Sequence, residues 1–269
     1  MPTLLCVHAH PDDESLFTAG ITSHYAEREV RNVLITCTMG QLGFDDHGRS
    51  GADLGHDAAV TRATRAGELM RAGELVGFDR QLTLGFKDSG MMGWLANQDG
   101  DAFMNADVEA TARFIADVID QENASVVVTY DENGFYGHPD HVMAHIVTRR
   151  AVELSSCAQR LFYPVVPRSV LKSFVHQALG QGVSLPAWVQ DAVADIPDEL
   201  VTCAMDVSRF SARKQQAIAT HASQSDNADL VTMDAELFAL IFGTEYYQLG
   251  WRRDESSLAC VEDLFGGLQ

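Results

Sequence analysis

The first half of the chain alternates short apolar runs with longer segments in which apolar residues recur at helical spacing. The apolar runs have the length and β-branched content of buried strands and cover residues 3–7, 31–38, 81–84 and 125–130. The segments with helical spacing cover residues 14–29, 58–76, 107–120 and 140–153. Gly77 follows the second of these segments, where a helix commonly ends. This alternation predicts βαβ units, in which helices connect parallel strands.

The second half of the chain has a less regular pattern. We expect strands at 161–166 and 200–205, and helices at 168–179, 210–222 and 233–241. No linker, fixed repeat or low-complexity tract separates the two halves. A length of 269 residues suits one large α/β domain. We therefore predict a single catalytic domain over residues 1–269, with a Rossmann-like, doubly wound, mostly parallel sheet and a C-terminal elaboration.

Two clusters of polar residues each follow a predicted buried strand. The first is His10-Pro11-Asp12-Asp13-Glu14, and the second is Tyr136-Gly137-His138-Pro139-Asp140-His141. In open parallel sheets, ligands bind beyond the carboxyl ends of the strands. The two clusters are therefore expected to face one crevice, although about 130 residues separate them.

The residue types in these clusters suit a divalent metal. Zn²⁺ takes imidazole nitrogen and carboxylate oxygen, and a hydrolytic site has three protein ligands and an open position. His10, Asp13 and His141 would supply that set. One Zn²⁺ per chain is expected, although Fe²⁺ and other divalent ions accept similar ligands.

The other polar residues of the clusters suit the steps of amide hydrolysis. Asp12 lies on a different azimuth of the turn from the ligands, which leaves it free to act as general base. His138 and Tyr136 are placed to stabilise an oxyanion or to protonate the leaving amine. Asp140 is suited to orient an imidazole through its second nitrogen.

Ordinary structural roles compete with these interpretations. His-Pro-Asp is a common turn sequence, and acidic residues at a helix start complement the helix dipole. His8 lies within a predicted strand and is interpreted as a buried, hydrogen-bonded core residue. His145 lies four residues after His141, a spacing that can ligate zinc, but we interpret it as a packed or solvated helix residue. The motifs of serine hydrolases, P-loop NTPases and dinucleotide-binding proteins do not occur.

Charge and hydropathy narrow the possible partners and location. A formal net charge of -19 argues against binding to the phosphate backbone of nucleic acids. No apolar segment is long enough to span a bilayer, and the N-terminus lacks the pattern of a signal peptide, so we expect a cytoplasmic location. Cys6, Cys37 and Cys203 lie within apolar runs and are expected to be buried free thiols.

The two clusters also carry a family resemblance. Residues 9–14 and 137–141 resemble the LmbE-like or PIG-L family of metal-dependent N-deacetylases. Residues 87–91 and 127–134 further resemble its mycothiol branch, which contains an N-acetylglucosaminyl-inositol deacetylase and a mycothiol S-conjugate amidase. The resemblance implies the zinc ligands, base and oxyanion-stabilising histidine named above, and a role for Tyr136 in polarising the substrate carbonyl. It also implies that Arg65 and Asp88 contact sugar hydroxyls.

The expected function is that of a zinc-dependent hydrolase that removes the acetyl group from an N-acetylglucosaminyl conjugate. Its partner would be a small-molecule N-acyl amino sugar, with no nucleic acid or membrane partner, and a homo-oligomer remains open. The alternatives are an amidase of thiol S-conjugates, with a wider mouth formed by residues 41–56 and 85–105, a deacetylase of another N-acetyl amino sugar, and a non-catalytic binding module with structural zinc. Gln41 stands where relatives usually carry Glu, so the substrate is left open.

Overall fold

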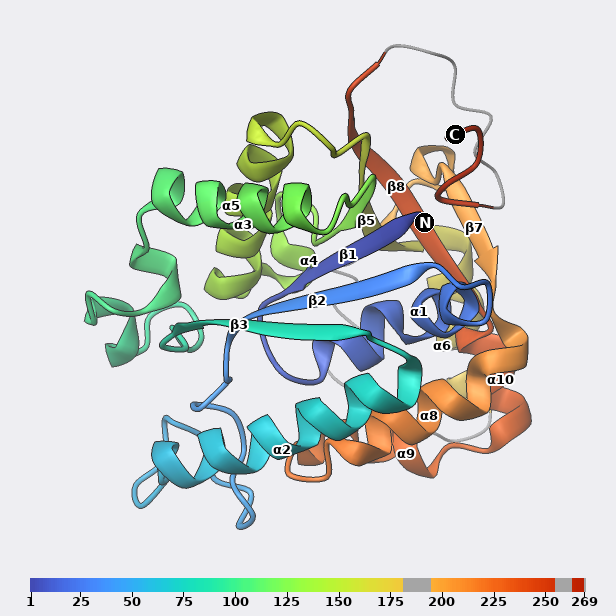
Figure 1. The fold of residues 1–269 in the computed structure, drawn as a ribbon. Helices are drawn as coiled ribbons and strands as arrows, with labels where there is room; N and C mark the ends of the chain where they lie inside the picture. Colours follow the sequence, from blue (N-terminus) through green and yellow to red (C-terminus); the bar gives the residue numbers. More distant parts are fainter. Residues whose placement is uncertain (181–194, 255–262, 269) are drawn as a thin grey trace.

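The strands of the computed structural model, which describes residues 1–180, 195–254 and 263–268, form one mixed sheet (Figure 1). Among the described residues the sheet has eight strands in the order β3-β2-β1-β4-β5-β8-β7, and β6 pairs with β5. The strands are β1 (Thr3–His8), β2 (Arg31–Thr38), β3 (Arg80–Phe86), β4 (Val126–Val128), β5 (Arg160–Pro167), β6 (Asp195–Ile196), β7 (Cys203–Asp206) and β8 (Thr244–Arg252).

Strand direction and order confirm the predicted fold class. Strands β1 to β5 pair in parallel, whereas β8 runs antiparallel to both β5 and β7. The chain moves outward from β1 through β2 to β3 and then returns to place β4 on the other side of β1. The order of connection therefore reverses between β1 and β4. Such a switch point is where ligands bind in open α/β sheets.

Helices cover both faces of the sheet. In Figure 1, α3 and α5 lie on one side, and α1, α2 and α8 lie on the other. The longer helices are α1 (Ala19–Ala26), α2 (Ala58–Val76), α3 (Val108–Gln121), α5 (Pro139–Leu154), α6 (Arg168–Gly180), α8 (Ser211–Thr220) and α10 (Ala235–Phe242). The short elements are α4 (Gly134–Gly137), α9 (Ala228–Thr232), and the turns at Glu14–Thr18, Leu95–Gln98, Phe103–Asn105, Asp198–Leu200, Ser208–Phe210 and Ser225–Asn227.

The buried strand β1 divides the core into two clusters. Leu5 and Val7 point into the cluster shared with α3 and α5, whereas Leu4 and Cys6 point into the cluster on the side of α1 and α2. All four side chains are fully buried. Side chains alternate between the faces of a strand, so a strand covered by helices on both faces is apolar at every position. Burial on both faces of β1 therefore explains why residues 4–7 are all apolar.

Helices α2 and α3 lie within one residue of their predicted bounds, and capping residues define their ends. The side chain of Asp57 accepts hydrogen bonds from the first backbone amides of α2, and Gly77 ends this helix with a φ of 97°. Asp107 caps α3 in the same way as Asp57 caps α2. The predicted buried thiols Cys6 and Cys37 are buried and form no disulfide bond, and Cys203 is buried as well.

Two predicted elements have clearly different bounds in the structure, and one long strand was not predicted. The predicted helix 14–29 begins with a π-helical turn, Glu14–Thr18, and α1 already ends at Ala26. The predicted strand 200–205 begins later, at Cys203, because a 3₁₀ turn precedes it. Strand β8 was not predicted, since Thr244–Arg252 is only partly buried and lacks a continuous apolar run.

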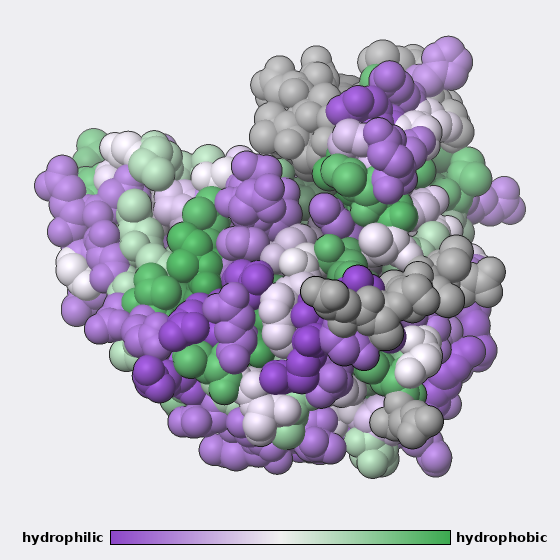
Figure 2. All heavy atoms as spheres, turned by 90° about the horizontal axis from the view of Figure 1, so that it is seen from above, coloured by the Kyte–Doolittle hydropathy of each residue, from purple (hydrophilic) through white to green (hydrophobic). Residues whose placement is uncertain are grey.

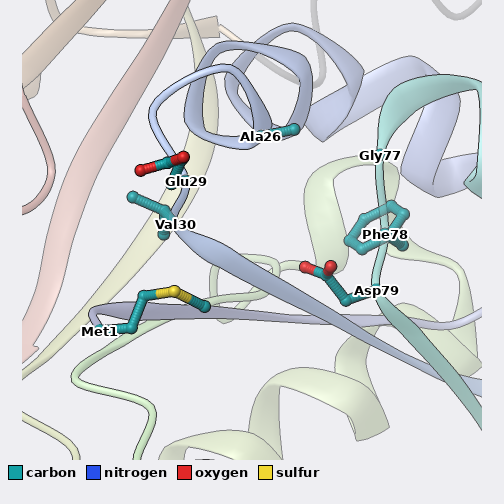
Figure 3. A pocket seen from close by; sticks show the side chains of 7 residues that line it. All are labelled: Met1, Ala26, Glu29, Val30, Gly77, Phe78 and Asp79. Carbon is teal, nitrogen blue, oxygen red and sulfur yellow. The ribbon is translucent and has the colours of Figure 1, made fainter.

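Figure 2 shows one face of the molecule, on which hydrophilic residues dominate. The hydrophobic residues of the described part of this face form a narrow band and small patches, and no broad apolar surface. None of the described helices has the length and apolar character needed to span a bilayer. A cavity of about 490 Å³ opens where β1, β2 and β3 begin (Figure 3). It is lined by Met1, Ala26, Glu29, Val30, Gly77, Phe78 and Asp79. This cavity lies at the opposite end of the strands from both polar clusters.

Candidate metal and catalytic site

The switch point between β1 and β4 brings the two polar clusters together. The two strands are parallel neighbours, with Cys6 paired to Val128, so their carboxyl ends meet at one edge of the sheet. The long connections 39–57 and 87–107 extend from this same end, at the left of Figure 1. As predicted, residues 10–14 and 136–141 face one another across this edge.

Three predicted ligand atoms form a compact triangle. Nδ1 of His10 lies 3.3 Å from Nε2 of His141 and 3.6 Å from Oδ2 of Asp13, and the latter two atoms are 3.4 Å apart. All three side chains are buried. Nitrogen and oxygen ligands about 2.0–2.2 Å from a tetrahedral zinc ion lie about 3.3–3.6 Å from one another. The residues therefore fit a divalent cation in both chemistry and spacing.

The second nitrogen of His10 is held by a carboxylate. Nε2 of His10 lies 3.1 Å from Oδ2 of Asp140, which also accepts the backbone N–H of Ser89 at 3.0 Å. Burial lowers the pKa of His10, but the hydrogen bond to Asp140 and the nearby carboxylates outweigh burial and raise that pKa to about 9. A proton held on Nε2 leaves the Nδ1 lone pair directed at the triangle, as metal binding requires.

Asp13 is fixed by Tyr130, to which the sequence analysis assigned no role in the site. Its Oδ2 accepts hydrogen bonds from the hydroxyl of Tyr130 at 2.7 Å and from the backbone N–H of His10 at 2.8 Å. Tyr130 is fully buried and lies just beyond the end of β4. Its position at a strand end, directly before the second cluster, was the only sequence signal of this role.

Asp12 lies beside the triangle without being part of it. Its Oδ1 is 3.2 Å from Nη2 of Arg65, and its Oδ2 accepts a 3.4 Å hydrogen bond from Asn227. Burial raises the pKa of Asp12, Arg65 lowers it and Asp13 raises it again, with a result of about 7. A carboxyl group with a pKa near neutrality is suited to general base catalysis.

His138 presents one nitrogen to the site. Its Nδ1 accepts the backbone N–H of Asp140 at 3.1 Å and so caps α5. Burial and the neighbouring imidazoles of His10 and His141 lower the pKa of His138 to about 2. The neutral ring therefore carries its proton on Nε2 and is a hydrogen-bond donor on that side. Tyr136 is 37% exposed, and its ring centroid is 4.9 Å from that of His141.

Arg65 and Asp88 are buried within the site and hold its loops. Nη1 of Arg65 donates a 2.8 Å hydrogen bond to the carbonyl of Gly40, and Nη2 donates to the carbonyl of Pro11. Asp88 accepts the backbone N–H groups of Leu42 at 3.1 Å and Gly90 at 2.8 Å. Arg65 thus lies inside the protein and not on the outer surface of α2. Sugar contacts by these two residues stay predictions.

The two histidines interpreted as structural lie outside the triangle. His8 is fully buried, and its ring nitrogens are 3.2 Å from the hydroxyl of Tyr130 and 3.0 Å from that of Thr18. Nδ1 of His145 lies 2.9 Å from the carbonyl oxygen of Tyr130. Both contacts agree with the structural interpretation of these residues.

The C-terminal part of the chain also reaches the site, which the sequence analysis did not foresee. Asn227 contacts Asp12, and Nε2 of His221 lies 2.7 Å from Oε1 of Glu14. These contacts span more than 200 residues of sequence, so no local pattern marks them.

Comparison with protein families adds an independent observation. Residues 5–152 match the family described as PIG-L, GlcNAc-PI de-N-acetylase. A "1D-myo-inositol 2-acetamido-2-deoxy-alpha-D-glucopyranoside deacetylase" of Acidothermus cellulolyticus is 39% identical over 268 residues, which cover 92% of this chain and 88% of the relative. A relative with the same name from Geodermatophilus obscurus is 35% identical and covers 98% of this chain and 97% of its own length.

Solved structures with a similar fold have lower sequence identity. N,N'-diacetylchitobiose deacetylase from Pyrococcus horikoshii is 16% identical with a TM-score of 0.59, over 92% of this chain and 83% of that chain. GalB, a 4-carboxy-2-hydroxymuconate hydratase from Pseudomonas putida KT2440, is 17% identical with a TM-score of 0.63, over 96% of this chain and 100% of that chain. Because a deacetylase and a hydratase share this fold, the fold alone does not identify the reaction.

Proposed function

This chain belongs to the PIG-L family of metal-dependent N-deacetylases, and from that premise we propose that it removes the acetyl group from an N-acetylglucosaminyl-inositol type of conjugate. Relatives named as deacetylases of that glycoside are 35% to 39% identical and cover nearly the whole chain. The linkage broken is the amide between the acetyl group and the sugar nitrogen. The immediate partner is a small-molecule acetylated amino sugar.

One observation carries the proposal: a separate carboxylate, Asp12, stands beside the triangle of His10, Asp13 and His141. A purely structural zinc site is closed and has no use for an adjacent base with a pKa near neutrality. The pKa of Asp12, about 7, is suited to taking a proton at physiological pH. This favours a hydrolase over a binding module with structural zinc.

We assign His10, Asp13 and His141 as the metal ligands and Zn²⁺ as the native ion. When bound there, a divalent cation would polarise the amide carbonyl and lower the pKa of a water molecule. Asp12 takes a proton from the attacking water as the water oxygen forms a bond with the amide carbon. Nε2–H of His138 and the hydroxyl of Tyr136 donate hydrogen bonds to the oxyanion that forms. Asp12 then returns the proton to the nitrogen as the C–N bond breaks.

We assign Arg65 and Asp88 to sugar binding. Arg65 lies on α2 and Asp88 on the connection that follows β3, and Oδ1 of Asp88 is 3.9 Å from Nε2 of His10. Nε of Arg65 is buried and has no hydrogen-bond partner among the described residues. The catalytic unit we propose is one domain, because β7 and β8 extend the same sheet and Asn227 reaches Asp12.

Amine release tests the proposal directly. Purified protein with analysed metal content should release a primary amine from N-acetylglucosaminyl-inositol and leave glucosaminyl-inositol. N-acetylglucosamine alone is the matched control for the aglycone, and N-acetylgalactosaminyl-inositol is the matched control for the sugar. Absence of amine release from every N-acetyl amino sugar by metal-loaded protein would contradict the proposed function.

A second candidate function is hydrolysis of a thiol S-conjugate, and exposed apolar side chains favour it. Met91, Met92 and Leu95 are 40%, 67% and 81% exposed, and Leu54 on the other long loop is 99% exposed. Such side chains would suit the apolar group of a conjugate. A higher kcat/KM for a bulky S-conjugate than for N-acetylglucosaminyl-inositol would favour this candidate.

A further inference from the structure

The backbone at Asp12 has an unusual conformation. Its φ is 106°, in the left-handed region that a residue with a side chain rarely adopts. Such a conformation persists only where surrounding contacts enforce it. The Asp12 carbonyl accepts the amides of Ser15 at 3.0 Å and Leu16 at 2.9 Å. The Asp12 amide donates a 2.9 Å hydrogen bond to Oε2 of Glu14.

Glu14 has no place in the mechanism above, although it is fully buried. Its Oε2 is occupied by the amide of Asp12, and its Oε1 accepts hydrogen bonds from the Ser15 hydroxyl at 2.6 Å and from Nε2 of His221 at 2.7 Å. Both oxygens are therefore committed, so Glu14 can neither ligate the cation nor act as the base. A buried carboxylate needs such partners, since an unpaired charge in the interior is strongly destabilising.

His221 holds Glu14 from the other end of the chain. It caps the C-terminal end of α8, 207 residues from Glu14, and its side chain is fully buried. Helix α8 packs against α1, α2 and the π-helical turn that begins with Glu14. The rotamer of Glu14 is thus fixed by an element that does not touch the ligand triangle.

We propose that Glu14 and His221 are positioning residues for Asp12: Glu14 holds the Asp12 amide and thereby aims the Asp12 carboxylate, and His221 holds Glu14. The inference rests on the proposed function in so far as Asp12 is the base. His221 at the end of α8 thus holds the Glu14 carboxylate, and Glu14 holds the backbone amide of Asp12. The orientation of the Asp12 backbone in turn sets the direction of its side chain.

Three variants test this inference. Glu14→Met removes both acceptors at similar size and should lower kcat on the order of 10- to 100-fold, as small misplacements of catalytic groups do, with KM and bound metal little changed. Glu14→Gln keeps an oxygen for the Asp12 amide and should recover most of kcat. His221→Leu should lower kcat in the same direction as Glu14→Met, because Glu14 is then unsupported.

Lys214→Met is the matched control. It breaks another buried ion pair of α8, with Glu245 at 2.7 Å, which does not touch Asp12. This variant should lose thermal stability and keep the wild-type kcat. Equal kcat for folded Glu14→Met and Lys214→Met, or no recovery in Glu14→Gln, would overturn the inference.

Crystal structures separate this inference from the proposed function. In Glu14→Met, or in His221→Leu if the first variant does not fold, the φ of Asp12 should leave the left-handed region. A φ that stays near the observed 106° would overturn the inference whatever the activity. A wild-type protein that releases no amine would instead overturn the proposed function, and the variant structure would still decide whether Glu14 holds Asp12.

Discussion

The hydroxyl of Tyr130 donates a 2.7 Å hydrogen bond to Oδ2 of Asp13, the oxygen that also lies 3.4 Å from Nε2 of His141. The same hydroxyl accepts the backbone N–H of Ala9 at 2.9 Å. One side chain from the end of β4 therefore orients a ligand that follows β1. Residues that hydrogen-bond to a metal ligand fix its orientation and thereby raise the affinity for the metal.

Tyr130→Phe should weaken metal binding by roughly 10- to 100-fold, because Asp13 loses a donor that fixes its rotamer. The measurement is a metal titration against a chelator of known affinity. Tyr25→Phe is the control, since it also loses a hydroxyl-to-carboxylate hydrogen bond, to Asp263 at 2.8 Å, but outside the site. Unchanged affinity in Tyr130→Phe would show that the hydrogen bond does not orient the ligand.

Metal affinity should fall as the pH falls. The pKa of His10 is raised to about 9, so below that pH a cation must displace its proton. The apparent Kd for the metal should therefore rise about tenfold for each unit by which the pH falls, since one proton is displaced on binding. Measurements between pH 6.5 and 8.5 would reveal this slope. Asp140→Asn should flatten it, because Asp140 is the partner that most raises the pKa of His10.

Asp12→Asn should lower kcat by about 10² to 10⁴, the usual contribution of a general base. Asparagine has the same shape and keeps a polar group beside Arg65, 3.2 Å away, but it cannot accept the proton. Metal content, measured on the same sample, should stay at the wild-type level. Wild-type turnover with bound metal would remove Asp12 from its proposed role.

The parts of the fold that could be predicted from sequence are those set by local signals. The strand at 31–38 has the predicted bounds because it is buried almost without interruption, and the helix at 58–76 has them because Asp57 and Gly77 cap it. The meeting of His10 with His141 was predictable for a related reason. Each follows a buried strand, and parallel strands end at one edge.

The features that could not be predicted depend on contacts across the chain. The π-helical turn after Asp13 accompanies the contact of Glu14 with His221, which lies 207 residues away. Strand β8 takes its place between β5 and β7 through antiparallel pairing, which leaves no periodic pattern in its sequence. Tyr130 fits the apolar pattern of a strand, so nothing in the local sequence indicates that its hydroxyl contacts Asp13.

The acid limb of the pH profile of kcat/KM should report Asp12. Its pKa is about 7, and a cation beside it can only lower this value, so the midpoint should lie at or below pH 7. Activity should rise with pH, because the base must be deprotonated. Arg65→Gln should move the midpoint to higher pH, since Arg65 lowers the pKa of Asp12. Arg62→Gln, on the exposed side of the same helix, should leave it unchanged.

The buried face of α3 allows a test of the fold apart from catalysis. Ile119 is fully buried against the core beside the sheet, whereas Phe114 on the same helix is 51% exposed. Ile119→Ala should lower the free energy of unfolding by about 2–5 kcal/mol, through lost burial and the cavity it leaves. Phe114→Ala should change it by no more than about 1 kcal/mol, because half of this residue is exposed to solvent. Urea unfolding would measure both, and equal losses would contradict the orientation of α3. Since neither residue touches the ligand triangle or Asp12, both folded variants should retain the wild-type kcat.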